Sequence, residues 1–154
     1  MSNNKVAYID IDQIMSQSIV GKLLEKKLKA LNNTNISKFE KKKKELAERE
    51  NAIIKKQNIL SKEDFELKVK TLQNDIKIFK KNVSKSRKDL NKKRVGATNE
   101  ILKVLNPILS EYSSKNSISL IIQKKNIVMG KAELDITKQI LDLINKKIKT
   151  VKLN

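Results

Sequence analysis

The chain has 154 residues with 35 Lys and Arg against 17 Asp and Glu, a formal net charge of +18, and it contains no His and no Cys. This composition excludes Ser-His and Cys-His nucleophiles and His/Cys sites for zinc or haem. The three glycines, Gly21, Gly96 and Gly130, are too far apart to form a phosphate-binding loop. We therefore expect no ATP hydrolysis, no cofactor and no enzymatic activity.

The first apolar segment, Val6-Ala7-Tyr8-Ile9, predicts a short buried strand. Asp10 and Gln13 have the spacing of a capping box, so a short helix should follow the strand directly. Ser18 then looks like the N-cap of a long helix. The start of the chain has no apolar segment typical of an export signal, which fits either a cytoplasmic protein or a mature exported chain.

The long helix that follows has one sparse apolar stripe, in which Phe39, Leu46, Ile53 and Leu60 recur every seven residues. Such a stripe suits packing against one partner helix. Four consecutive poor helix formers interrupt the pattern and predict a kink or hinge. These residues are Asn32, Asn33, Thr34 and Asn35.

A second long helix is predicted from about residue 62 to residue 112, with Ser61 as its N-cap and a bend at Pro107. Its apolar residues alternate in steps of four and three, which is a coiled-coil heptad seam. The seam residues are Phe65, Val69, Leu72, Ile76, Phe79, Val83, Ser86 and Leu90, continuing after a stutter through Ala97, Ile101, Leu105 and Ile108. Because the connection near residues 60–62 is short, the two helices should form an antiparallel hairpin arm.

The last part of the chain predicts a β-hairpin and a final helix. The strands are 118–122 and 127–129, joined by a turn at 124–126. Thr137 is the expected N-cap of the helix.

The predicted fold class is therefore α+β, mainly α, with residues 1–19 and 113–154 forming a small β-body and residues 20–112 forming the arm. A body of about 60 residues is too small to be stable alone, and its strands have unpaired edges. Both difficulties disappear if several copies share one sheet or barrel. The expected interface residues are Val6, Tyr8, Ile9, Leu120, Ile121, Ile122, Ile127, Val128 and Met129.

This order of elements resembles the Skp/OmpH family of chaperones for outer-membrane proteins. The matching segments are Lys5-Val6-Ala7-Tyr8-Ile9-Asp10, Ser18-Ile19-Val20-Gly21-Lys22, Leu60-Ser61, Ile118 to Met129, and Asp135-Ile136-Thr137. The resemblance implies a periplasmic homotrimer in which a shared β-body carries three helical arms. It also implies that the arms enclose a cavity, hold unfolded outer-membrane β-barrel proteins there and release them without ATP.

The positive charge is concentrated in the predicted arm, since residues 22–100 contain 24 Lys and Arg against 11 Asp and Glu. Three such arms would focus a positive potential on a cavity and attract acidic unfolded clients. Any single lysine run is more often simply the solvated side of a helix. The expected client-binding residues are Lys41, Lys42, Lys43, Lys44, Lys55, Lys56, Lys80, Lys81, Lys92, Lys93 and Arg94.

The alternative hypothesis is a basic coiled coil that binds nucleic acid or the ribosome, since the sequence pI is about 10.0. Only five aromatic residues and three arginines are present, so stacking and bidentate phosphate contacts are scarce. Nucleic acid is therefore the less favoured partner. Attachment to anionic lipid or lipopolysaccharide surfaces through the same lysines is a third interpretation, which can coexist with the first.

Overall fold

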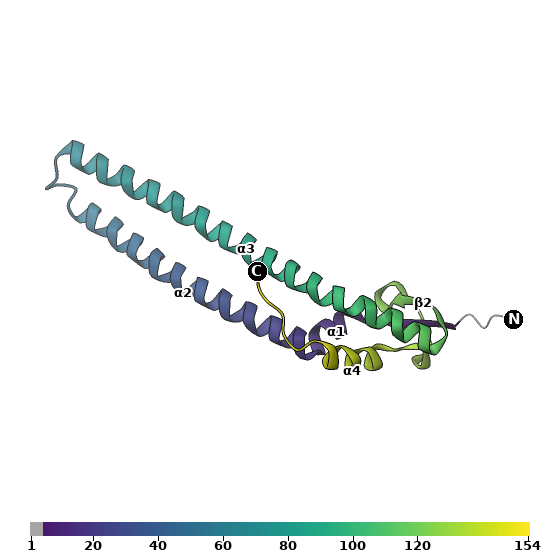
Figure 1. Ribbon diagram of the computed structural model, residues 1–154. Coiled ribbons are helices and arrows are strands. Elements are labelled where there is room, and N and C mark those ends of the chain that lie inside the picture. Colours follow the sequence, from purple (N-terminus) through teal and green to yellow (C-terminus); the bar gives the residue numbers. More distant parts are fainter. Residues whose placement is uncertain (1–4) are drawn as a thin grey trace. The chain divides into compact units, whose positions relative to one another are not determined.

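The computed structural model (Figure 1) describes residues 5–154. The chain divides into two compact units. The terminal unit contains the residues up to Leu28 together with Lys93–Asn154, and the hairpin unit contains Lys29–Lys92. The strands and α-helices are β1 (Lys5–Ile9), α1 (Ile11–Gln17), α2 (Ile19–Lys55), α3 (Lys62–Asn116), β2 (Ile118–Gln123) and α4 (Thr137–Lys147). The predicted α+β class, mainly α with long helices and a small sheet, is confirmed.

The sheet of the terminal unit consists of β1 and β2, paired in parallel with Ala7 opposite Ile121. The predicted β-hairpin is wrong, because β2 ends at Gln123 and residues 124–126 form a short 3-10 turn. Residues 127–129 are not a strand in the single chain. The other edge of β1 is partly covered, since the backbone N–H of Ile136 donates to the carbonyl of Tyr8 at 3.0 Å. Among the described residues, the outer edge of β2 has no strand beside it.

Half of the buried apolar side chains of the terminal unit come from helix segments that the sequence pattern assigned to the arm. Its buried apolar side chains are Ala7, Ile9, Ile14, Val20, Leu24, Leu28, Ala97, Ile101, Leu105, Ile108, Ile136, Ile140, Ile144 and Val151. Residues 20–28 and 93–112, which were assigned to the arm, belong to the terminal unit, so this unit is larger than the expected body of about 60 residues. The stutter residues 97–108 continue the arm's periodicity, but here they lie in one unit with α1 and α4, which pack on each other. Chain size alone thus gives a weaker reason for oligomerisation than predicted.

A close contact joins α1 to α2. The Ser18 hydroxyl, fully buried, accepts a hydrogen bond from the backbone N–H of Gly21 at 3.0 Å, which confirms Ser18 as the cap. The N–H of Ile19 donates to the side-chain oxygen of Asn145 in α4 at 2.8 Å. A Cβ atom on Gly21 would lie only 1.7 Å from the carbonyl oxygen of Met15, so the backbone of α1 approaches α2 where only glycine fits.

A second polar junction fastens the start of α4 to the end of β1. The Thr137 hydroxyl donates to the Asp135 carboxylate and accepts from the Asp10 N–H at 2.9 Å. Thr137 is thus the first residue of α4 and not its N-cap as predicted, because the Asp135 carboxylate accepts from the Thr137 N–H. Asp10 caps α1 by accepting from the N–H of Gln13 at 2.9 Å. The reciprocal half of the capping box is not formed, since Thr137 occupies that place.

We expect Thr137→Val to lower the free energy of unfolding by about 1 to 3 kcal/mol, because it leaves the Asp10 N–H without its acceptor in a site where Thr137 is only 3% exposed. Chemical denaturation followed by circular dichroism measures this. Thr71→Val is the matched control, since that exposed hydroxyl only donates to a carbonyl of its own helix and its loss should cost less than about 0.5 kcal/mol. Equal costs for the two variants would contradict a structural role for this junction.

In the hairpin unit α2 and α3 run antiparallel, side by side, as Figure 1 shows. Phe39 and Phe79 touch edge to face with ring centroids 6.0 Å apart, and Arg49 bonds Asp75 at 2.8 Å. The Ser61 hydroxyl caps α3 by accepting from the Asp64 N–H at 3.1 Å, as predicted.

The predicted seam of the hairpin unit is confirmed, because the apolar heptad residues of both helices are buried or half-buried. The seam is narrow, since Leu46 and Leu72 are the only buried side chains among the described residues of this unit. Helix α2 continues without a break through residues 32–35, so the predicted interruption at Asn32, Asn33, Thr34 and Asn35 is not observed. A hinge motion within this continuous helix stays a prediction. Helix α3 likewise continues through Pro107.

Candidate functional site

In one zone of the hairpin unit nearly all of the charged residues are cationic. We call residues 38–44 of α2 and 77–88 of α3 the basic band; the two segments flank the Phe39–Phe79 contact and therefore lie beside each other. The basic band contains 11 Lys and Arg and a single acidic residue, Glu40, so its net charge is +10. Ten of these cations are exposed and Lys42 is half-buried.

The rest of the hairpin unit is electrically balanced. Residues 45–75, the tip segment, contain six Lys and Arg against seven Asp and Glu. Exposed apolar side chains occur here, including Ile59 at 81% and Leu67 at 64%. The excess charge is therefore not spread along the helices but is concentrated in the basic band.

The predicted client-binding cations fall into three groups. Lys41, Lys42, Lys43, Lys44, Lys80 and Lys81 lie in the basic band, Lys55, Lys56 and Lys92 lie elsewhere in the hairpin unit, and Lys93 and Arg94 belong to the terminal unit. The Arg94 guanidinium forms an ion pair with the Glu25 carboxylate. Five further cations of the band were missed: Lys38, Lys77, Lys85, Arg87 and Lys88. They do not belong to the dense basic runs, and only the antiparallel pairing of α2 and α3 brings the segments together.

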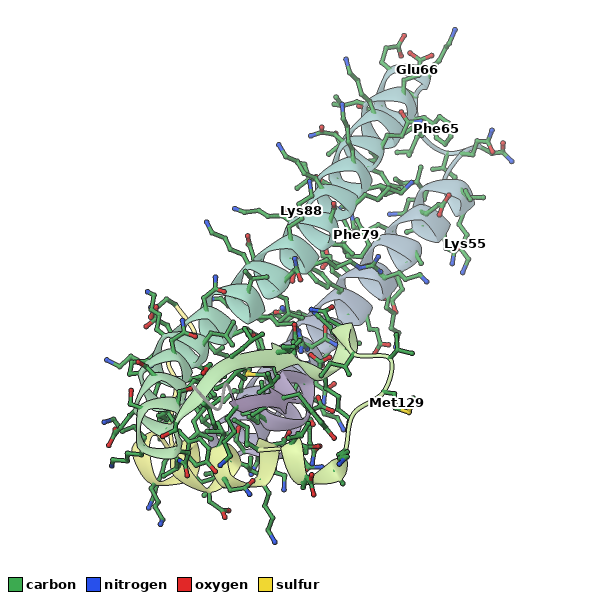
Figure 2. The ribbon with its side chains drawn as sticks, turned by 90° about the vertical axis from the view of Figure 1, so that its right-hand side faces the viewer. Lys55, Phe65, Glu66, Phe79, Lys88 and Met129 are labelled. Atoms are coloured by element: carbon green, nitrogen blue, oxygen red, sulfur yellow. The ribbon has the colours of Figure 1, made fainter. Side chains whose placement is uncertain are left out.

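Most charges of the basic band have no counter-ion in the part of the chain that the structure describes. Within residues 5–154 the only ion pair of a band cation is Lys42 with Glu45, at 2.7 Å. Figure 2 shows Lys88 directed away from α2, whereas Phe65 and Phe79 point toward it. The aromatic rings therefore belong to the seam, as predicted. The band's cations other than Lys42 form no ion pair within residues 5–154 and can attract an external anion.

The predicted interface residues differ in their availability. Ile9 is only 2% exposed and packs into the chain's own core, so almost none of its side chain is available to another subunit. Tyr8, Ile121, Ile122 and Ile127 are half-buried. The most exposed are Val6 at 39%, Leu120 at 53%, Met129 at 89% and Val128, which is fully exposed.

Other ionisable groups have local structural roles. The pKa of Glu111, an exposed carboxyl on α3, is lowered chiefly by its hydrogen bond with Lys115 and by the charge of that lysine. The Asp10 carboxylate caps α1 by accepting from the N–H of Gln13. In the described part of the chain, residues 5–154, no cluster of carboxylates suits a metal ion and no helix has the length and apolar character needed to span a membrane.

Comparison with known proteins agrees with this architecture. A family model described as outer membrane protein (OmpH-like) matches residues 5–144. The chain belongs to this family. The fold of this OmpH-like chain is similar to a crystal structure from Caulobacter crescentus CB15 that is assigned as an OmpH-like outer membrane chaperone, with a TM-score of 0.91 and 16% identity over 100% of this chain and 91% of that one. No curated protein shows a significant match.

Proposed function

We propose that this OmpH-like chain is an ATP-independent chaperone that binds unfolded outer-membrane β-barrel proteins through its basic band. The observation that carries the proposal is a net charge of +10 on residues 38–44 and 77–88, with one ion pair among their cations within residues 5–154. A coiled coil that needed only solubility would mix both signs in i,i+4 pairs. The unbalanced band instead suits capture of an acidic polypeptide.

The same surface accounts for release without an energy source. Exposed lysines attract an anion over a distance of about a Debye length, roughly 8 to 10 Å at physiological salt, but each contact is weak. Their long apolar stems and the thin seam add nonspecific contact with unfolded chain. A client held by many weak contacts is free to leave when its own folding offers more stable ones.

We further propose a homotrimer in the periplasm, with three hairpins around a cavity. In the described part of the chain the outer edge of β2 has no neighbouring strand, and this edge together with the exposed Leu120, Val128 and Met129 supports self-association of the terminal unit. Trimerisation would bring three basic bands together and raise the total formal charge to about +54, which strengthens steering of a client.

The test is capture of a urea-denatured outer-membrane β-barrel protein on dilution, followed by light scattering with and without the purified chain. We expect aggregation to be suppressed at about 0.05 M salt and much less at about 0.5 M, and the chain to have the mass of a trimer. A monomer that fails to suppress aggregation at low salt contradicts the proposal. Tight binding of RNA with a steep salt dependence, and no effect on the unfolded barrel, would favour the nucleic-acid alternative.

A further inference from the structure

A groove between α2 and α3 overlaps the basic band, extends along α2 to Asn32, and combines apolar with cationic groups. It has a volume of about 400 Å³, and its apolar lining includes Ile36 and Phe39 from α2 with Phe79 and Val83 from α3. The side chains of Lys43 and Arg87 line it as well, and Glu40 is its only acidic lining residue. Ile36 is 45% exposed and the other three apolar side chains are half-buried.

The spacing of these residues places the two cations at opposite ends of the apolar stretch. On α2 the order toward the turn is Ile36, Phe39 and Lys43, whereas on the antiparallel α3 the order away from the turn is Phe79, Val83 and Arg87. Phe39 and Phe79 contact each other and so lie at the same height along the hairpin. Lys43 follows Phe39 by four residues toward the turn, and Arg87 follows Phe79 by eight residues away from the turn. At 1.5 Å per residue the two cations are about 18 Å apart along the helices.

An extended polypeptide matches this arrangement. At about 3.3 Å per residue, 18 Å corresponds to five or six residues, and side chains at every second position face the same way. Resting on the proposed function, we infer that the groove is a client subsite for an extended segment with apolar or aromatic side chains on one face and a carboxylate at each end. Within residues 5–154 neither Lys43 nor Arg87 has an ion-pair partner, so both are available to these carboxylates.

The experiment uses the full chain and a fluorescein-labelled peptide, Asp-Thr-Leu-Thr-Trp-Thr-Asp, at low salt. Binding is followed by fluorescence anisotropy for the natural chain, for Arg87→Gln and for Lys88→Gln. Lys88 is the matched control, because it is an exposed neighbour in the same band that points away from α2 (Figure 2). We expect Arg87→Gln to weaken binding about three- to tenfold and Lys88→Gln less than about twofold. A peptide whose terminal Asp residues are both Ser should lose this difference.

Peptide binding and capture of a whole unfolded barrel protein test the subsite and the proposed function separately. If both variants weaken the peptide equally, only the diffuse field of the band acts and the subsite is overturned, while capture of a whole unfolded barrel remains intact. If peptide binding depends on Arg87 but the chain does not capture unfolded barrel proteins, the subsite is supported and the chaperone proposal is contradicted. Tighter binding of single-stranded RNA with the same dependence on Arg87 would overturn the peptide assignment.

Discussion

Replacing Gly21 with alanine is expected to lower the midpoint of thermal unfolding by about 6 to 12 °C. The added Cβ would lie 1.7 Å from the carbonyl oxygen of Met15 and 2.9 Å from the Ser18 hydroxyl, so the start of α2 must move away from α1. Overpacking of this kind typically costs 1 to 3 kcal/mol, and we expect about 3 kcal/mol because the obstructing atom belongs to the backbone. A change of 1 kcal/mol corresponds to roughly 2 to 4 °C for a chain of this length.

Gly96→Ala is the matched control for this prediction. A Cβ atom on Gly96 would meet nothing within 4 Å, and the residue lies inside α3. Alanine there should raise the free energy of unfolding by about 0.5 to 1 kcal/mol, because glycine is the poorer helix former. Both variants are compared by circular dichroism at 222 nm. A Gly21→Ala chain that melts no lower than the natural protein would contradict the close contact between α1 and α2.

Local patterns predicted the helices well. The heptad seam of α3 depends on residues three and four apart, so its pattern can be read without knowing any distant contact. Ser18 and Ser61 were predictable for the same reason, because each cap bonds an N–H three residues on. The Asn32 to Asn35 segment shows the limit of local propensity. Its weak preference against helix is overridden within a helix of 37 residues.

Long-range pairing could not be predicted in the same way. The parallel partner of β1 is β2, more than a hundred residues away, and the apolar run at residues 127–129 has strand composition without a strand partner in the single chain. Thr137 has the composition of a cap, but its hydroxyl is used by Asp10 from the other end of the sequence. The apolar spacing from Ala97 to Ile108 predicts a buried helix face, but it does not identify the elements that pack against this face.

The basic band was found only in part for a related reason. Lysine runs are visible in the sequence, but isolated residues such as Lys38 and Arg87 join them only after the hairpin closes. The net charge of residues 22–100 taken together also does not show that the tip segment has nearly equal numbers of acidic and basic residues. The structure therefore narrows the candidate site from the whole arm to two segments beside the Phe39–Phe79 contact.

Neutralising five cations of the basic band is expected to slow capture of an unfolded acidic client about tenfold or more at low salt. The variant carries Gln at Lys41, Lys44, Lys77, Lys80 and Lys81, all of which are exposed and none of which lines the groove. It lowers the charge of the band from +10 to +5, and electrostatic steering of association falls with the local field. Stopped-flow fluorescence of a labelled, denatured barrel protein measures the rate.

The control places the same five changes in the tip segment, at Lys55, Lys56, Lys62, Lys68 and Lys70, which are also exposed. Both variants have a formal net charge of +13 per chain instead of +18, so they differ only in where the charge is removed. Because Gln and Lys have similar helix propensities, neither should lose helix content. We expect the band variant to be much the slower at about 0.05 M salt and the two rates to converge near 1 M, where the Debye length is about 3 Å. Equal slowing at low salt would mean that total charge, and not the basic band, controls capture, and no slowing would contradict electrostatic capture altogether.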